Sequence, residues 1–297
     1  MARTDKIISN KKNISRGWVN GFIGVVIFSG SLPATKAAIA GFPPDFLTIL
    51  RAIFAGVLAI IILMVLQQNI PHKKQLIPLS IVAIGVVIGF PFLTALALQH
   101  VSSAHSIVFL GLLPLITALF GALRAGERPN KIFWFFAVLG SLLVMSFALM
   151  QKGEISIIGD VYMVSAIILC GLGYAEGAVL SKQLGSWQVI CWALVISLPL
   201  MLILSIILWP QNLTNIPINA WIGLIYVSLF SMLIGFFFWY KGLAEGGITG
   251  VSQLQLFQPF FGLLFSAWLL NETVSGVMIA STCGVIICVA GSKWFTR

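Results

Sequence analysis

The chain has 297 residues and a formal net charge of +9, yet only 8% of its residues are charged and 59% are hydrophobic. A soluble domain carries roughly 25% charged residues, so this composition excludes a protein with a water-facing surface all round. The lysines and arginines are spread between apolar runs, a pattern that orients a protein in a bilayer. We therefore expect a lipid bilayer as partner and no nucleic acid.

Ten apolar segments follow one another, and each is long enough for a helix that crosses about 30 Å of hydrocarbon. They cover residues 18–40, 46–66, 76–98, 103–123, 131–150, 159–180, 187–209, 219–241, 249–270 and 275–294. The breaks between them are short, so no linker can hold a soluble domain. The sequence predicts an all-α membrane protein with ten transmembrane helices, preceded by a cytoplasmic tail over residues 1–17.

The first apolar segment follows a basic stretch and has a signal peptide as its alternative interpretation. Its length exceeds the roughly 7–15 residues of a signal-peptide hydrophobic region, so we interpret it as the first transmembrane helix. With a cytoplasmic N-terminus, the outer half of the protein contains only three of its 17 basic residues, Lys36, Arg51 and Lys152, whereas the eight acidic residues divide evenly. This bias predicts a bacterial inner-membrane protein with both termini in the cytoplasm.

The second half of the sequence repeats the first at near-constant spacing. A shift of 145 positions places Pro114 on Pro259 and Glu127 on Glu272, and a shift of 141 places Gly30 on Gly171. The repeats are residues 18–150 and 159–294, each with an odd number of predicted spans, so the second must enter the membrane in the opposite orientation. Such inverted repeats recur in secondary transporters.

Three features of the fourth and fifth predicted spans recur in the ninth and tenth predicted spans. They are Leu112-Leu113-Pro114 with Phe257-Gln258-Pro259, Glu127 with Glu272, and Gly140 with Gly284. With these features the chain resembles the drug/metabolite transporter superfamily, of the type with two EamA domains, over residues 18–294. The resemblance implies ten helices around a central cavity and export of small metabolites, often amino acids. The Trp-Gly pair common in the family's first helix reads Ser29-Gly30 here.

Ionisable residues inside the predicted spans are functional candidates, because a charge buried in lipid costs several kcal/mol. Lys36 and Arg51 lie near the outer ends of their spans; the alternative for both is snorkelling to the lipid headgroups. Glu176, beside Tyr174, lies near the inner end of the sixth span, and its alternative is a structural ion pair with Lys241. We expect these three charged groups at opposite mouths of a substrate path. Glu176 is the candidate proton carrier, since a carboxyl group removed from water can exchange a proton near neutral pH.

Polar and aromatic residues of the last spans complete the candidate path. Gln255 and Gln258 are three residues apart, hence on one helix face, and either line the substrate site or form hydrogen bonds between helices. Tyr240 ends an aromatic run that either stacks a planar substrate or faces lipid. Pro114 and Pro259 lack an N–H group and are expected to kink their helices at mid-membrane, with a role in gating.

Other chemistry is absent from the sequence. The four cysteines have no metal-binding spacing, and no nucleotide-binding or hydrolase motif occurs, so we expect no cofactor, no metal and no enzyme. A membrane enzyme would need clustered nucleophiles or metal ligands, and a scaffold would not need buried Glu176. We expect a secondary transporter for a small-molecule substrate, driven by protons or by exchange. The resemblance favours export of amino acids or related small metabolites. The alternative is uptake or exchange of a larger metabolite such as a nucleotide derivative, which a cluster of bases in the cavity would favour.

Overall fold

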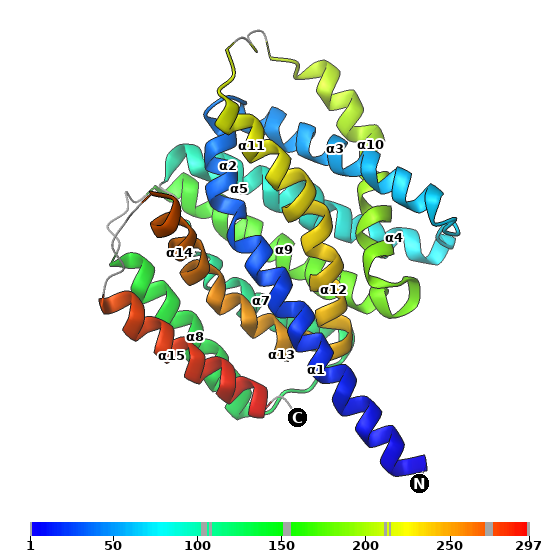
Figure 1. Ribbon diagram of the computed structural model, residues 1–297, viewed down its shortest axis with the longest axis vertical. Coiled ribbons are helices and arrows are strands. Elements are labelled where there is room, and N and C mark those ends of the chain that lie inside the picture. Colours follow the sequence, from blue (N-terminus) through cyan, green and yellow to red (C-terminus); the bar gives the residue numbers. More distant parts are fainter. Residues whose placement is uncertain are drawn as a thin grey trace.

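The computed structural model describes residues 2–101, 106, 109–150, 156–210, 213, 215–270 and 276–295, and within these ranges the chain forms helices and no strand. Figure 1 shows the helices packed as one bundle. Glu272 and the start of the predicted fourth span, residues 103–105, lie outside the described residues.

The N-terminal helical rod consists of α1 (Ala2–Ser29) and α2 (Ser31–Ile39), so helix extends into the segment predicted as a tail. The break at Gly30 has a local cause. Tyr226 packs against Gly30 and donates a hydrogen bond to the Ile27 carbonyl at 2.7 Å, and the Ser29 hydroxyl donates to the Val25 carbonyl at 2.7 Å. Hydroxyl groups that bond to backbone carbonyls in this way bend helices.

The next rods in the first half are α3 (Pro44–Val65), then α4 (Lys73–Val82), η1 (Ala83–Gly89) and α5 (Phe90–His100) in direct succession, followed by α7 (Leu113–Ala125) and α8 (Lys131–Leu149). The second half contains α9 (Ile157–Leu184), α10 (Ser186–Ile207), the succession α11 (Ile218–Tyr226), η2 (Val227–Ile234) and α12 (Gly235–Gly246), then α13 (Ile248–Ser252), η3 (Gln253–Phe257), α14 (Gln258–Leu270) and α15 (Gly276–Trp294).

The elements η1 and η2 are both π-helical, and each interrupts a long rod near its middle. They occupy corresponding positions of the two sequence repeats, since the shift of 145 positions that places Pro114 on Pro259 also places Gly89 on Ile234. π-helical turns are rare and occur frequently at functional sites. Both elements are therefore candidate parts of a functional site in the interior of the bundle.

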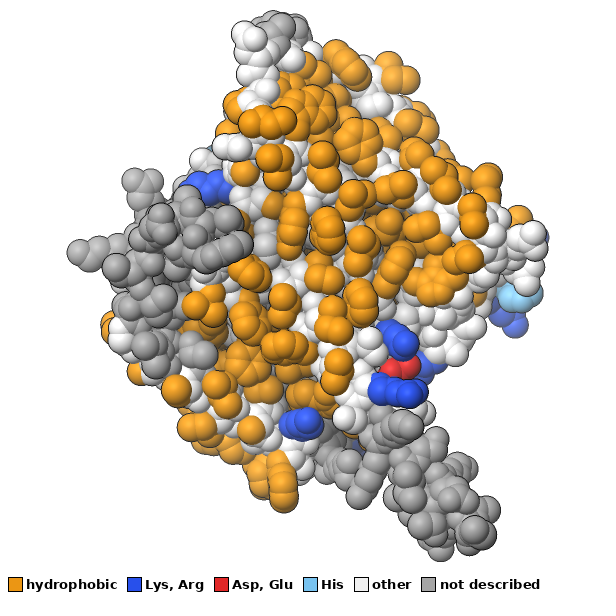
Figure 2. Space-filling view, in the orientation of Figure 1, with side chains coloured by type: hydrophobic (Ala, Val, Ile, Leu, Met, Phe, Trp, Pro, Cys, Tyr) orange, Lys and Arg blue, Asp and Glu red, His pale blue; other side chains and the backbone are white. Residues whose placement is uncertain are grey.

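Six helical rods are long and apolar enough to cross a membrane by length and composition. They are Asn13–Ile39, Pro44–Val65, Lys73–His100, Ile157–Leu184, Ser186–Ile207 and Ile218–Gly246; shorter apolar helices cover Leu113–Ala125, Lys131–Ser146 and Cys283–Trp294. The surface agrees, because large apolar side chains such as Ile61, Ile203 and Ile206 are exposed, and Figure 2 shows few charged groups among them. The chain is a multi-pass membrane protein.

Glycines bring two helices into backbone contact at one end of the bundle. α1 packs along α12 (Figure 1), and a Cβ atom added to Gly242 would lie 2.5 Å from the Gly21 nitrogen and 2.9 Å from the Gly17 carbonyl oxygen. Gly17 likewise packs against the backbone of Gly246. Small residues at such spacing let helix backbones approach in lipid, where side-chain hydrophobicity gives no preference for helix contact.

Candidate functional site

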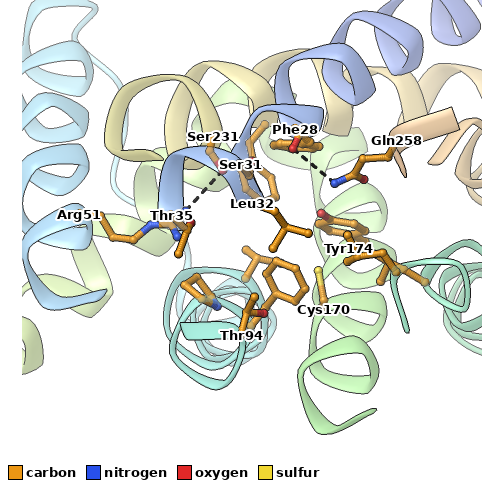
Figure 3. Close-up of a pocket in the computed structure, with 16 residues that line it drawn as sticks. Phe28, Ser31, Leu32, Thr35, Arg51, Thr94, Cys170, Tyr174, Ser231 and Gln258 are labelled. Atoms are coloured by element: carbon orange, nitrogen blue, oxygen red, sulfur yellow. Dashed lines mark hydrogen bonds between the residues drawn. The ribbon is translucent and has the colours of Figure 1, made fainter. Parts of the chain in front are cut away.

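A cavity lies inside the bundle, and sixteen side chains from both halves of the sequence line it (Figure 3). They come from α1, α2, α3, η1, α5, α7, α9, η2, α12 and α14, together with Leu110. The list is Phe28, Ser31, Leu32, Thr35, Arg51, Val86, Phe90, Pro91, Thr94, Leu110, Leu113, Cys170, Tyr174, Ser231, Phe236 and Gln258.

The cavity is small in this conformation. Its volume is about 40 Å³. One water molecule needs roughly 10–15 Å³ of such volume, so the cavity has room for a few waters and not for a metabolite. Binding of a substrate therefore requires the helices around the cavity to move apart.

Arg51 reaches into the cavity from α3. The residue is 7% exposed, and its Nη2 donates to the Val227 carbonyl at 3.3 Å and to the Ser231 hydroxyl at 3.4 Å. Its Nε atom is buried and, among the described residues, has no hydrogen-bond partner. The snorkelling alternative is therefore wrong for Arg51, whose head group faces the interior of the protein (Figure 3).

Hydroxyl groups surround the arginine. Ser31 donates to Ser231 at 2.7 Å, and Thr35 lies beside Arg51 in Figure 3. The buried Thr94 hydroxyl also lines the cavity and has no hydrogen-bond partner in the described part of the chain. This side of the cavity thus concentrates hydrogen-bond donors in an otherwise apolar interior.

The opposite side of the cavity carries Gln258 and Tyr174 (Figure 3). Gln258, 9% exposed, donates from Nε2 to the Phe28 carbonyl at 3.4 Å. Gln258 therefore both lines the cavity and bonds another helix, so the two readings of this residue are compatible. Gln255 is 1% exposed, lies beside the Tyr174 hydroxyl and is not among the residues that line the cavity.

An aromatic layer, made of Phe28, Tyr174, Phe236 and Trp239, closes one wall of the cavity. Tyr174 stacks on Phe28 with ring centroids 6.4 Å apart, and its centroid lies 5.8 Å from that of Phe236 and 5.4 Å from that of Trp239. The first three residues line the cavity, whereas Trp239 is fully buried behind them.

Tyr240, from the same aromatic run, is fully buried and donates to the Gly173 carbonyl at 3.2 Å. The alternative that this run faces lipid is therefore wrong for Phe236, Trp239 and Tyr240. Tyr240 does not line the cavity in this conformation; its ring instead packs on Gly177 of α9.

Glu176 lies outside the cavity lining, where α7 and α9 end side by side. Its Oε2 accepts a hydrogen bond from Arg124 Nε at 2.8 Å. The structural pair weighed from the sequence had the wrong cation, because Lys241 is exposed and the partner is Arg124. The sequence offered little sign of this pair, since Arg124 lies one residue beyond the predicted fourth span, 103–123.

A second acidic residue, Glu127, connects the segment after α7 to the start of α13 at the same end of the bundle. Glu127 accepts from the backbone N–H groups of Ile248 and Thr249, each at 2.8 Å, where α13 begins. With the Arg124–Glu176 pair and the Gly17–Gly246 contact, these bonds form a layer that we call the sealed end of the bundle.

The remaining predicted residues divide between helix breaks and the surface. Lys36 is exposed on α2 and does not line the cavity, unlike Arg51. Pro114 and Pro259 occupy the first turns of α7 and α14, and the regular α-helix is interrupted before each, by a turn at residues 111–112 and by η3. The Pro114 carbonyl accepts from the Ser252 hydroxyl at 3.3 Å and from Gln253 Nε2 at 3.4 Å.

Sequence reasoning missed several residues that line the cavity, namely Ser31, Thr35, Thr94, Cys170 and Ser231. A small polar residue inside an apolar span carries little signal, because its hydroxyl can bond its own helix backbone. The repeat offered one clue, since Ser231 falls on Val86 and Gln258 on Leu113 at the shift of 145, and all four line the cavity.

Comparisons with known proteins agree with this architecture. The EamA-like transporter family matches residues 15–148 and 157–294. The uncharacterized transporter YdeK of Bacillus subtilis (strain 168) is 60% identical over 95% of this chain and 99% of its own length. The pseudopaline exporter CntI of Pseudomonas aeruginosa (strain UCBPP-PA14) is 25% identical over 89% and 90%. One solved crystal structure has the same fold, with a TM-score of 0.78 at 18% identity over 93% of this chain and 97% of that one.

Proposed function

Because the chain belongs to the EamA-like transporter family, we propose that this membrane transporter is a secondary exporter of amino acids or related small metabolites across the bacterial inner membrane. One observation carries the proposal: a cavity inside the bundle, lined from both family-matched segments, contains hydroxyl, amide and guanidinium groups that lipid contact does not require. Polar groups at such depth mark substrate pathways.

The composition of the cavity favours a small substrate over a nucleotide derivative. A cluster of bases was the feature expected for the larger anion, and Arg51 is the one cation among the described lining residues, because Lys36 lies outside. A polyphosphate would leave several negative charges without a partner in the membrane interior.

The sealed end and the cavity together suggest how access is controlled. The cavity lies on the side of the aromatic layer away from Trp239, whereas the sealed end is closed by an ion pair, two backbone hydrogen bonds and glycine contacts. With a cytoplasmic N-terminus, the sealed end is the cytoplasmic end, and transport requires these contacts to open while the outer side closes. The helix breaks before Pro114 and Pro259 are candidate hinges for this change.

The proposed topology has ten transmembrane helices in two inverted repeats, residues 18–150 and 159–294, with both termini in the cytoplasm. Helical residues occur within each of the ten predicted segments, and α1 begins at the same end of the bundle at which α15 ends (Figure 1). Phosphatase fusions in the matched loops at residues 41–43 and 185 test the inversion. We expect activity from the first loop only; equal activity from both loops would refute inverted insertion.

The function is tested by metabolite profiling of spent medium from bacteria that express the wild type or the double variant Gln255→Leu/Gln258→Leu at matched membrane levels. Gln68→Leu is the matched control, since that amide lies in the turn after α3 and away from the cavity. Amino acids or relatives should accumulate with the wild type and the control, but not with the double variant. Unchanged medium with the wild type would refute export.

A further inference from the structure

Arg51 is a buried cation without a carboxylate partner. Among the described residues, no Asp or Glu forms an ion pair with it, and its hydrogen bonds are the two long contacts of Nη2 with Val227 and Ser231. Its Nε has no hydrogen-bond partner within the described part of the chain. A guanidinium has five N–H donors, so most of its hydrogen-bonding capacity is unused in this conformation.

An unpaired guanidinium in this position is costly. Arginine keeps its charge under all physiological conditions, and a buried charge without a counter-charge costs several kcal/mol. The residues on either side of it in α3, Leu50 and Ala52, are apolar, and a purely structural role would be fulfilled by a neutral hydrogen-bond donor. Within the described part of the chain this cation therefore has no counter-charge, and a bound anion can supply one.

We propose that Arg51 binds a single carboxylate group of the substrate, held in the cavity by the guanidinium fork and the neighbouring hydroxyls of Thr35 and Ser231. The planar fork matches a carboxylate through two parallel hydrogen bonds, and the unpartnered Nε is one of the donors that such a pair uses. The proposal rests on the proposed function, because it names the group by which the exported metabolite is recognised.

The rest of the lining defines the remainder of the ligand. None of the described lining residues is acidic, and most are apolar or aromatic. A second carboxylate or a phosphate dianion would find no second cation. An amino group of the substrate can instead contact the ring face of Tyr174 or the Gln258 amide oxygen, across the cavity from Arg51 (Figure 3). The chemistry therefore fits an apolar amino acid or another monocarboxylate with an apolar body.

The test measures ligand-induced thermal stabilisation of the purified full-length protein. The probes are the apolar L-amino acids, their carboxamides, 4-methylpentanoate, glutarate and AMP. The variants are Arg51→Gln, Arg51→Lys and a matched control, Thr48→Val. Thr48 lies one turn away on the same helix, is buried, bonds its own backbone at Pro44, and does not line the cavity.

We expect apolar amino acids and 4-methylpentanoate to stabilise the wild type and Thr48→Val, and the carboxamides, glutarate and AMP to have little effect. Arg51→Gln should weaken the apparent affinity by about 30-fold or more, and Arg51→Lys by less, because lysine keeps the charge without the fork. If Arg51→Gln does not fold, two other measurements test the carboxylate contact. The wild type should bind carboxylates more tightly than carboxamides, and this preference should be smaller in Arg51→Lys.

Three results would overturn the assignment in distinguishable ways. Equal stabilisation by amino acids and by their carboxamides would refute the proposed contact between Arg51 and a carboxylate. If export into the medium is intact in that case, the proposed function still holds. Unchanged affinity in Arg51→Gln would refute the same contact. Stabilisation by AMP alone, lost in Arg51→Gln, would overturn both the carboxylate assignment and amino-acid export in favour of a nucleotide substrate.

Discussion

Glu176 on α9 and Arg124 on α7 form an ion pair at 2.8 Å that joins a buried carboxylate to a half-exposed guanidinium; their side chains are 7% and 46% exposed. The two residues belong to different family-matched segments, 15–148 and 157–294. Because the pair lies at the sealed end and not in the cavity, its natural role is to hold the two halves of the chain together on one side of the membrane.

The asymmetry of exposure predicts unequal effects on stability. Arg124→Gln leaves a buried carboxylate without a partner, whereas Glu176→Gln leaves a guanidinium that water can reach. We expect Arg124→Gln to destabilise the protein by roughly 1–3 kcal/mol and Glu176→Gln by less than about 1 kcal/mol, as measured by thermal unfolding in detergent. Equal losses would mean that the carboxylate is hydrated at this end.

The same two variants separate gating from proton coupling. If Glu176 carries protons, Glu176→Gln should abolish pH-dependent accumulation in vesicles while substrate exchange continues, and Arg124→Gln should retain the pH dependence. If the pair acts only as a gate contact, both variants should alter the exchange rate alike and leave the pH dependence intact. Counterflow and gradient-driven uptake, measured in the same vesicles at two pH values, distinguish these outcomes.

Glu127 stabilises the start of α13 by accepting hydrogen bonds from the Ile248 and Thr249 N–H groups. Glu127→Ala leaves both donors without this acceptor, and a lost cap of this kind typically costs about 1–2 kcal/mol. We expect a lower unfolding temperature for Glu127→Ala, with recovery in Glu127→Gln of roughly half the loss because the amide oxygen can accept one bond. No change in either variant would contradict the cap.

Close backbone packing between α1 and α12 predicts a steric effect. The Cβ atom of alanine at Gly242 would lie 2.5 Å from the Gly21 nitrogen, so Gly242→Ala must separate the helices. Overpacking of this kind costs about 1–3 kcal/mol. Gly276→Ala is the matched control, because nothing lies within 4 Å of a Cβ atom at Gly276. Equal unfolding temperatures for both variants would contradict the packing.

The aromatic layer predicts a graded effect on transport. Tyr174→Ala should open a passage between the cavity and the buried side of Trp239, whereas Tyr174→Phe keeps the ring that contacts Phe28 and Phe236. We expect leak of small solutes from vesicles with the alanine variant and near-normal retention with phenylalanine. Because the sealed end also closes the path, exchange in the same vesicles is the second readout: an unchanged exchange rate with Tyr174→Ala would show that Phe28 and Trp239 close the wall without the tyrosine.

Some properties of this protein follow from its sequence alone. The length of the apolar runs and the shortage of charged residues determine a helical membrane protein, since each span must satisfy its backbone hydrogen bonds internally. The paired motifs around Pro114 and Pro259 indicated the transporter family, which the family match confirms. The helix breaks before both prolines were also predictable, because proline lacks the N–H group that a continuous helix uses.

Only the tertiary structure decided which polar groups meet. Lys36 and Arg51 have similar positions in their predicted spans, yet the first is exposed and the second lines the cavity. A span that is apolar on every side has no periodicity to show which face looks inward. Likewise, the sequence suggested Lys241 as the ion-pair partner of Glu176, and the contact between α7 and α9 selected Arg124. Such choices depend on packing between segments far apart in the chain, which local composition does not encode.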